Sequence, residues 1–309
     1  MRDRILLLLL CASAAGLVAC DRGRAPLAAP PPAERTPTPA SLATAPDHRD
    51  LSYADGARRL DLYLPERPAG PAPVAVWLHG GSWVAGSKTP APRVLLDLRG
   101  RGFAVAAVDY RLSGLSSHPA QVHDVKGAVR WLRAHARDYG LDPSRVYLVG
   151  FSAGGHLAAL AALTAGDPAA EGDVGGNLDR SSAVAGVVVY AGAGDLPRLA
   201  GECVGCETSE QFLALGCSFL LCGERGRLAS PVTYARRDAP PFLLLHGDAD
   251  RVIPLEQSTL LDRALREAGA SSRLVAVEGA PHGLLDARAD GETQRFLLGL
   301  AGLDGVRSP

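Results

Sequence analysis

Short, continuous apolar runs recur at intervals along most of the chain. Runs of this kind are typical of strands that are buried on both faces of a sheet, as the strands of parallel sheets are. The pattern therefore predicts a series of buried strands. They lie at residues 74–78, 103–108, 146–149, 184–190, 242–245 and 274–277.

Stretches with apolar residues at helical spacing lie between these runs. The clearest is 121–139, where Val122, Val125, Val129 and Leu132 form a single stripe. Four more helices are predicted by weaker patterns of the same kind. They lie at residues 93–99, 155–165, 256–268 and 291–300.

The folded part of the chain opens with a different pattern. Residues 49–53 and 58–64 alternate polar and apolar positions around Asp55-Gly56, which predicts an antiparallel hairpin. Strands and helices alternate after it, so we expect an α/β fold whose mostly parallel, doubly wound sheet follows this N-terminal hairpin. In such sheets the loops at the carboxyl ends of the strands form the binding site.

Residues 1–19 follow the pattern of an export signal. Arg2 and Arg4 precede an apolar run at 5–10, and small residues lead to Leu-Val-Ala-Cys at 17–20. That tetrapeptide resembles the bacterial lipobox, in which the cysteine receives a diacylglyceryl group and cleavage occurs just before it. The resemblance implies lipidation of Cys20 and an anchor on the periplasmic or other extracytoplasmic face of a bacterial cell envelope. The alternative is a plain secretory signal.

Residues 20–46 are rich in Pro, Ala and Thr, which predicts an extended tether without a core of its own. Residues 47–309 are then long enough for one α/β domain. The formal charge of the whole chain is -1 and no basic block is present, so nucleic acid is not expected as a partner. The choice between inner and outer membrane and the oligomeric state stay open.

Four cysteines crowd into one stretch of the domain that lacks strong periodicity. They are Cys203, Cys206, Cys217 and Cys222. This spacing suits a tetrahedral zinc site, whereas export to an oxidising compartment favours disulfides. We expect two disulfides and no metal, with all three pairings open. In either case the cysteines would cross-link an insertion in the domain.

A serine turn follows the predicted strand at 146–149. Residues 150–154 read Gly-Phe-Ser-Ala-Gly, and a helix is predicted directly after them. A nucleophile elbow needs a tight, strained strand-to-helix turn with small flanking residues, which presents the serine hydroxyl at the edge of the sheet. The motif is weak by itself, and a serine in a structural turn is the alternative. The strand-to-helix context favours Ser152 as a nucleophile.

The segment His-Gly-Gly-Ser-Trp at 79–83 closes the predicted strand at 74–78. Acyl transfer develops negative charge on an oxygen atom, and preformed N–H donors must face that oxygen. We assign these donors, the oxyanion hole, to the backbone N–H groups of Gly81, Ser82 and Ala153. The glycines let the backbone approach a substrate closely.

Gly80, Trp83 and His79 of the same segment also have predicted roles. Gly80 and Trp83 are expected to contact the substrate, and the alternative for Trp83 is packing within the loop. His79 could be mistaken for a catalytic base. We expect it to brace the loop by hydrogen bonding instead.

The acid and the base come from two later loops. The loop after the predicted strand at 242–245 carries two carboxylates, Asp248 and Asp250. Asp250 is favoured because the chain resembles a family whose pattern places the acid at this second position, just before the Val-Ile-Pro element. His282 is the only histidine after Asp250, so the chain order Ser, Asp, His selects it as the base. Asp250 would then orient the imidazole and stabilise its charged form.

Several further polar residues receive structural interpretations. Asp109 and Asp124 are expected to stabilise loops near the site. Capping, surface or packing roles are predicted for three histidines, His118, His123 and His156. His48 and His135 are expected to be exposed.

Taken together, these motifs resemble the α/β-hydrolases of the feruloyl-esterase-like and hormone-sensitive-lipase-like group. The similarity rests on 79–83, Val-Asp-Tyr-Arg at 108–111, His-Pro-Ala-Gln at 118–121, Gly-Phe-Ser-Ala-Gly-Gly-His at 150–156 and the Asp250 and His282 loops. It extends from about residue 49 to 300, which is nearly the whole domain. The cysteine insertion is a departure, at a place where relatives have part of a lid or pocket wall.

The resemblance implies a serine carboxylic ester hydrolase that needs no cofactor and acts on small or medium acyl esters. Ser152, His282 and Asp250 would be its catalytic residues. An amide or peptide hydrolase, such as an arylformamidase-like enzyme, is the alternative with the same apparatus. A non-catalytic binding lipoprotein on a hydrolase scaffold is the alternative from another class.

Overall fold

The computed structural model describes residues 44–202, 223–283 and 286–305. The predicted signal at 1–19, Cys20 and nearly all of the predicted tether lie outside the described residues, and so do Cys203, Cys206, Cys217 and Cys222. Lipidation and the disulfides therefore stay predictions. In the part of the chain that the structure describes, no helix has the length and apolar character needed to cross a bilayer.

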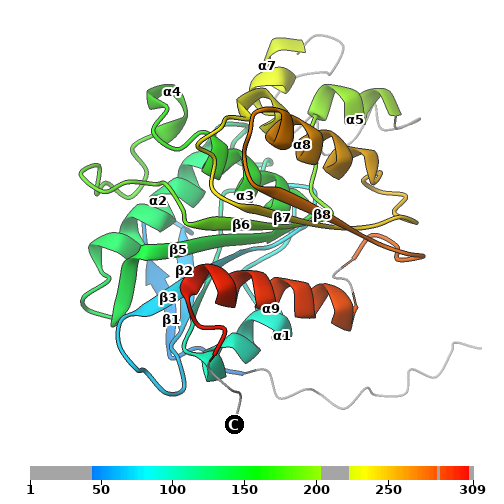
Figure 1. Cartoon of the computed structure of the whole chain (residues 1–309). Helices are drawn as coiled ribbons and strands as arrows, with labels where there is room; N and C mark the ends of the chain where they lie inside the picture. The colour runs from blue at the N-terminus through cyan, green and yellow to red at the C-terminus, as the bar shows by residue number, and fades with distance from the viewer. Residues whose placement is uncertain (1–43, 203–222, 284–285, 306–309) are drawn as a thin grey trace, which may run out of the picture. The chain divides into compact units, whose positions relative to one another are not determined.

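Among the described residues, eight strands form one sheet in the order β1-β2-β4-β3-β5-β6-β7-β8 (Figure 1). β1 pairs antiparallel with β2 and β2 with β4, while every other neighbouring pair is parallel. The predicted α/β-hydrolase class, a mostly parallel sheet with an antiparallel N-terminal hairpin, is confirmed. The strands are β1 His48–Ser52, β2 Arg59–Tyr63, β3 Ala72–Leu78, β4 Ala104–Val108, β5 Leu141–Phe151, β6 Gly186–Tyr190, β7 Phe242–Gly247 and β8 Ser272–Val277.

Helices cover both faces of the sheet, with α2, α3 and α8 on one face and α1 and α9 on the other (Figure 1). The α-helices are α1 Arg93–Leu96, α2 Ala120–Ala134, α3 Ala153–Leu163, α4 Pro168–Glu171, α5 Leu196–Glu202, α7 Gly223–Leu228, α8 Glu256–Glu267 and α9 Ala287–Ala301. Successive side chains of β3 divide between the two cores. Val74, Val76 and Leu78 pack on the α2 side, and Ala75 and Trp77 on the α9 side. Burial on both faces explains why the strands read as continuous apolar runs.

Two predicted helices show the clearest differences from the observed ones. The helix predicted at 121–139 ends at Ala134, because the chain beyond it turns back and Gly140 adopts a φ of 63° just before β5 begins. The helix predicted at 93–99 divides into α1 and a 3₁₀ helix, Asp97–Arg101. Gly102 ends that 3₁₀ helix with a φ of 94°, a value that glycine adopts without steric cost.

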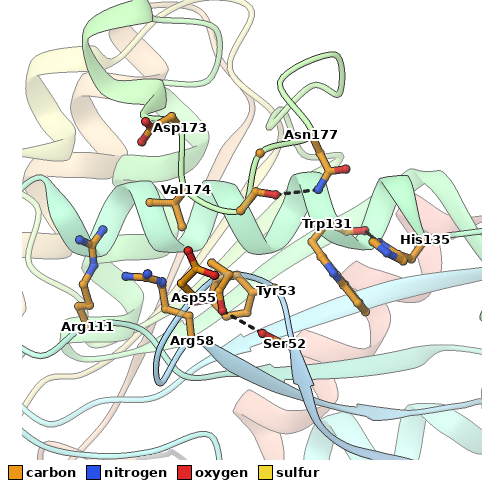
Figure 2. Close-up of a pocket in the computed structure, with 13 residues that line it drawn as sticks. Ser52, Tyr53, Asp55, Arg58, Arg111, Trp131, His135, Asp173, Val174 and Asn177 are labelled. Carbon is orange, nitrogen blue, oxygen red and sulfur yellow. Dashed lines mark hydrogen bonds between the residues drawn. The ribbon is translucent and has the colours of Figure 1, made fainter.

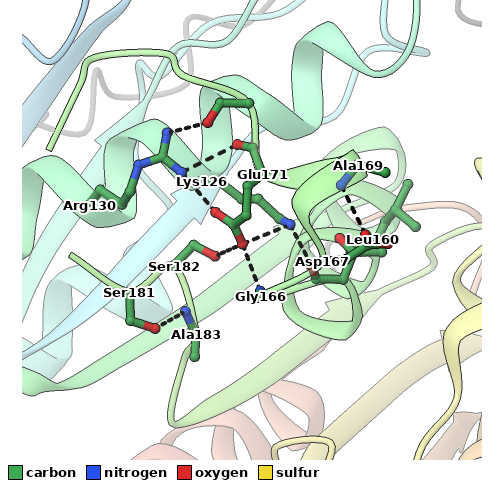
Figure 3. Close-up of polar contacts among 12 residues, drawn as sticks. Lys126, Arg130, Leu160, Gly166, Asp167, Ala169, Glu171, Ser181, Ser182 and Ala183 are labelled. Atoms are coloured by element: carbon green, nitrogen blue, oxygen red, sulfur yellow. Dashed lines mark hydrogen bonds and ion pairs between the residues drawn. The ribbon is translucent and has the colours of Figure 1, made fainter. Parts of the chain in front are cut away.

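A buried charge cluster fastens the segment after α3 onto α2 (Figure 3). The Glu171 carboxylate pairs with Lys126 Nζ at 3.2 Å and with an Arg130 guanidinium nitrogen at 2.9 Å. It also accepts hydrogen bonds from the Ser182 hydroxyl and from the Gly166 N–H. The side chains of Lys126 and Arg130 are 0% and 2% exposed. Within the described residues, Glu171 is the carboxylate recorded in ion pairs with both cations.

We expect Glu171→Gln to lower the free energy of unfolding by about 3–5 kcal/mol, because removing one partner of a buried ion pair leaves uncompensated charge in the core. Urea unfolding at pH 7 measures this loss. Glu224→Gln is the matched control, since Glu224 pairs with Arg227 at 2.8 Å in an exposed position. The control should unfold like the parent. Equal unfolding curves for the two variants would contradict the prediction.

The same cluster predicts how stability depends on pH. Burial by itself raises the pKa of Glu171, but hydrogen bonds from Ser182 and Gly166 and the nearby Lys126 charge outweigh burial and lower the pKa. A carboxyl whose pKa is lower in the folded state stabilises the fold fully above its unfolded pKa, about 4.3. This contribution is lost as the pH falls through the folded pKa. The difference in stability between parent and Glu171→Gln should therefore shrink below about pH 4.

Candidate functional site

Ser152 lies at the turn between β5 and α3, with a φ of 54° and a ψ of -119°. Two glycines make room for this turn. A Cβ on Gly150 would lie 2.2 Å from the Gly154 carbonyl oxygen, and a Cβ on Gly154 would lie 2.1 Å from the Leu78 carbonyl oxygen. The Ser152 N–H donates to the Tyr190 carbonyl at 2.8 Å, which ties the turn to β6. The sheet thus holds a strained residue at its carboxyl edge.

The structure brings Ser152, His282 and Asp250 into one hydrogen-bonded row. His282 Nε2 lies 3.0 Å from Ser152 Oγ, and His282 Nδ1 lies 2.7 Å from Asp250 Oδ2. Because a carboxylate can only accept, Nδ1 carries the proton, which leaves Nε2 of the neutral ring to accept from the serine hydroxyl. The ring of Phe151 packs beside the imidazole at a centroid distance of 5.0 Å. In this tautomer, Nε2 is free to take the serine proton.

The Asp250 side chain is buried, and donors engage both of its oxygens. Oδ1 accepts from the N–H groups of Val252 at 2.8 Å and Ile253 at 2.9 Å. Oδ2 faces His282 and also lies 3.3 Å from His246 Nε2. Burial by itself would raise the pKa of Asp250, but the hydrogen bonds from the two imidazoles and the two backbone N–H groups hold this pKa well below its usual range. Asp250 is therefore an anion at neutral pH.

The rival acid, Asp248, occupies a different environment. Its side chain is exposed, and Oδ1 accepts from the Gly279 N–H at 2.7 Å. Of the two carboxylates in this loop, it is Asp250 that hydrogen-bonds to His282. The difference arises because the turn at Val252 and Ile253 directs the Asp250 side chain inward.

Successive residues of the glycine-rich loop after β3 adopt positive φ values. They are 120° at Gly81, 51° at Ser82 and 63° at Trp83. The Gly81 carbonyl accepts from two N–H groups further along the loop, at 3.0 and 2.9 Å. Among the described residues, no acceptor is recorded for the N–H of Gly81 or Ser82. Ala153 is the first residue of α3, where an N–H has no partner within the helix.

The glycine-rich loop lies directly against the serine turn. A Cβ on Gly80 would lie 2.8 Å from the Phe151 ring, and a Cβ on Gly154 would lie 2.4 Å from the His79 carbonyl oxygen. Both contacts require glycine, because any side chain would separate the two segments. This close approach keeps the predicted donors Gly81 and Ser82 next to the turn that carries Ser152.

His79 braces this loop, as predicted. Its Nδ1 lies 2.7 Å from the Gly80 carbonyl oxygen, and its ring stacks on Tyr110 at a centroid distance of 4.3 Å. The Tyr110 hydroxyl donates to the His79 carbonyl at 2.7 Å. Burial lowers the pKa of His79, so the ring is neutral at pH 7 and its Nδ1–H donates to the carbonyl.

Trp83 is 5% exposed and belongs to the apolar core on the α2 side of the sheet. Its indole Nε1–H donates to His156 Nδ1 at 3.2 Å, and the Nε2 of the same imidazole donates to the Ala229 carbonyl at 2.7 Å. Burial lowers the pKa of His156 to about 4, which keeps the bridge neutral. Trp83 and His156 therefore both have packing roles in the structure, which is the alternative given for Trp83 and one of the roles predicted for His156. Substrate contact by Gly80 and Trp83 stays a prediction.

Two other predicted acids stabilise loops, as expected. Asp109 accepts from the Lys88 N–H at 2.6 Å, and the buried Asp124 pairs with Arg111 at 2.8 Å.

The predicted exposure of His48 and His135 is wrong, because both rings pack against aromatic neighbours and are half-buried. His48 meets Tyr139 at a centroid distance of 4.9 Å, and His135 stacks on Trp131 at 4.1 Å.

A polar cavity of about 680 Å³ lies beside α2, between the β1–β2 turn and residues 173–177 (Figure 2). Arg58, Arg111 and Trp131 are among the residues that line it, and none of the predicted site residues is. The cavity is therefore separate from the predicted serine site.

Within the described part of the chain, no group of three or more His, Cys, Asp or Glu side chains is arranged to hold a metal ion.

His246 is the contact to this site that the sequence interpretation passed over. It is the last residue but one of β7, where its side chain is fully buried against the Asp250 carboxylate. A polar residue directly after an apolar strand run is a recognisable signal, because a polar group buried there needs hydrogen-bond partners. The sequence alone does not say which partners these are.

Comparison with known proteins finds a matching family model and similar proteins that are named esterases. The family model described as BD-FAE matches residues 60–265. The chain is 35% identical over 251 residues to Esterase LipC of Mycobacterium tuberculosis, an alignment that covers 79% of this chain and 62% of LipC. The chain thus spans about three-fifths of the length of this curated relative.

Solved esterases share the fold. A truncated carbohydrate esterase from gut microbiota superposes with a TM-score of 0.78 at 29% identity, covering 85% of this chain and 99% of that one. The propionate-bound esterase Est2 of Thermogutta terrifontis gives a TM-score of 0.65 at 28% identity, covering 85% and 97% of the two chains. Both alignments extend well beyond the serine turn.

Proposed function

The chain belongs to the BD-FAE family of α/β-hydrolases, and from this membership we propose that it is a serine carboxylic ester hydrolase. One observation carries the proposal. The hydroxyl of Ser152, the imidazole of His282 and the carboxylate of Asp250 form a continuous hydrogen-bonded row, with distances of 3.0 and 2.7 Å. This is the arrangement that activates a serine for attack on a carbonyl carbon.

Acylation begins when Ser152 Oγ attacks the ester carbonyl carbon and His282 Nε2 takes the hydroxyl proton. The carbonyl oxygen becomes an oxyanion, which the N–H groups of Gly81, Ser82 and Ala153 stabilise in our assignment. The tetrahedral intermediate then collapses. The bond to the alcohol oxygen breaks, Nε2 gives its proton to that oxygen, and the acyl group stays on Ser152.

Deacylation repeats these steps with water in place of serine. Nε2 of His282 removes a proton as the water oxygen attacks the acyl carbon, and the same N–H donors meet the second oxyanion. The bond to Ser152 Oγ breaks, Oγ recovers its proton from Nε2, and the carboxylic acid leaves. Throughout, Asp250 holds Nδ1–H and stabilises the imidazolium that forms in each half-reaction.

Esters of small or medium acyl groups are the proposed substrate class. The Thermogutta esterase was solved with propionate, and the gut protein is named a carbohydrate esterase. These facts concern those proteins, and they motivate a panel of short-chain esters of phenols, simple alcohols and acetylated sugars. Matched anilides in the same panel separate an esterase from the amide-hydrolase alternative.

A fluorophosphonate probe tests the proposal directly, because it captures activated serines and should not react with a binding module. We expect stoichiometric labelling of the purified protein, and peptide mass spectrometry should find the adduct on Ser152. Labelling should disappear after thermal unfolding, because Oγ is activated only while the hydrogen bonds between Ser152, His282 and Asp250 are intact. A protein that stays unlabelled while folded would refute the proposal.

A further inference from the structure

His246 is a fully buried histidine at the end of β7, 0% exposed, and the reaction outlined above does not use it. Its two nitrogens have distinct surroundings. Nδ1 lies 2.7 Å from the Ser258 hydroxyl on α8. Nε2 lies 2.8 Å from the Ile253 carbonyl oxygen and 3.3 Å from Asp250 Oδ2.

These contacts fix the tautomer of the ring. A carbonyl oxygen can only accept hydrogen bonds, so Nε2 carries its proton and donates to the Ile253 carbonyl at 2.8 Å, while the same N–H lies 3.3 Å from Asp250 Oδ2. In the neutral ring Nδ1 then accepts, and the Ser258 hydroxyl donates to it. The polar side chains of Ser258, His246, Asp250, His282 and Ser152 therefore lie in sequence, joined by hydrogen bonds except between His246 and Asp250, where the contact is 3.3 Å.

We infer that His246 is a positioning residue for the proposed hydrolysis, in which its Nε2–H helps to hold the Asp250 carboxylate in the orientation that faces His282. The inference rests on the proposed function and extends it by one residue. His246 touches neither substrate nor Ser152. It acts through Asp250, so it is not a catalytic residue itself.

The geometry explains what this contact adds. Two backbone N–H groups, from Val252 and Ile253, hold Oδ1 of Asp250. The other oxygen, Oδ2, is shared by His282 at 2.7 Å and His246 at 3.3 Å. With His246 in place, the carboxylate has a donor on each side, and rotation about its Cβ–Cγ bond would break both contacts.

The contact also limits the negative charge that Asp250 presents to His282. The titratable groups recorded against the Asp250 carboxylate are His246 from β7 and His282 from the loop after β8. Ser258 of α8 lies behind His246, and the exposed Asp248 is hydrogen-bonded to Gly279. Loss of the Nε2–H donor would leave more charge on Oδ2, which favours the protonated form of His282.

Three substitutions at this position separate positioning from simple packing. Gln carries an amide whose oxygen and nitrogen match the spacing of the two ring nitrogens, so His246→Gln can accept from Ser258 and donate toward Asp250. Met has a similar length and no donor. Asn is polar but shorter, so His246→Asn can satisfy Ser258 without reaching Asp250. The Asn variant keeps the test available if the Met variant does not fold.

We expect His246→Met and His246→Asn to lower kcat for p-nitrophenyl acetate about 10- to 100-fold, the effect of losing a hydrogen bond to a charged group. KM should change little. The acid limb of the kcat/KM profile should move to higher pH by about 0.5–1 unit. His246→Gln should keep the parental acid limb and most of kcat.

Folding of each variant is checked by circular dichroism and thermal melting. A folded Met or Asn variant with parental kcat and an unmoved acid limb would overturn the inference. A Gln variant as impaired as the Met variant would overturn it too, because the donor would then not be the relevant feature. Failure of the parent protein to react with fluorophosphonate would instead refute the proposed function, so the two failures are distinguishable.

Discussion

Replacement of Ser152 by alanine should lower kcat for p-nitrophenyl acetate about a millionfold. Of the three hydrogen-bonded residues Ser152, His282 and Asp250, it is Ser152 that is proposed to form the acyl-enzyme. The fold should survive the change. Ser152 is 6% exposed, its hydroxyl is recorded only against His282, and alanine adopts the φ of 54° at much the same cost as serine. Initial rates and a thermal melt measure the two quantities on the same sample.

Ser87→Ala is a suitable control for this experiment. Ser87 is an exposed serine on the chain that follows the glycine-rich loop, and its hydroxyl donates to the Thr89 carbonyl at 2.9 Å. The control should retain parental activity and stability. Residual activity above about 1% in a pure Ser152→Ala sample would place the nucleophile elsewhere, since loss of the acyl-enzyme should cost far more.

Replacement of Asp250 by asparagine should lower kcat about 10⁴-fold with little loss of structure. The hydrogen bonds of Asp250 determine how the amide would sit. The N–H groups of Val252 and Ile253 require an acceptor at the Oδ1 position, so the amide oxygen would stay there. The amide NH₂ would then face His246 and His282 in place of Oδ2. To accept from it, His282 would have to move its proton from Nδ1 to Nε2.

That tautomer points a proton at Ser152 Oγ, where a lone pair is needed to accept one. The loss should therefore appear in kcat rather than in KM. Asp248→Asn is the matched control from the same loop, because Asp248 accepts only from the Gly279 N–H among the described residues. We expect the control to remain within a few-fold of the parent. The reverse ranking of the two variants would assign the acid to Asp248.

Local patterning predicted the architecture well, for identifiable reasons. Strands β3 and β7 are buried on both faces, so their sequences are continuous apolar runs that need no knowledge of their neighbours. Helix ends were harder to predict. Ala134 ends α2 because the chain must return to β5, and the apolar stripe that marks the helix carries no information about that return.

The site divides in the same way. The turn at 150–154 and the loop at 79–83 could be identified from sequence because strained turns and close backbone approaches demand glycine. The roles assigned to Ser152, Asp250 and His282 stay predictions, although the structure joins the three side chains by hydrogen bonds. His246 and its contact with Asp250 could not be derived, because burial and partner choice depend on how β7 meets α8.

By itself, the sequence determined the α/β class and the order of the strands and helices along the chain, and it nominated candidate residues for acyl transfer. These features can be recognised from the short-range periodicity of apolar residues and from glycines at positions where the backbone conformation requires them. The tertiary structure set Asp250, the acid favoured by the sequence interpretation, against His282. It alone decided that His246 lies beside Asp250 and that Glu171 pairs with both Lys126 and Arg130. Such pairings join residues distant in sequence, and their energies come from burial and geometry that exist only after the sheet and its helices have packed.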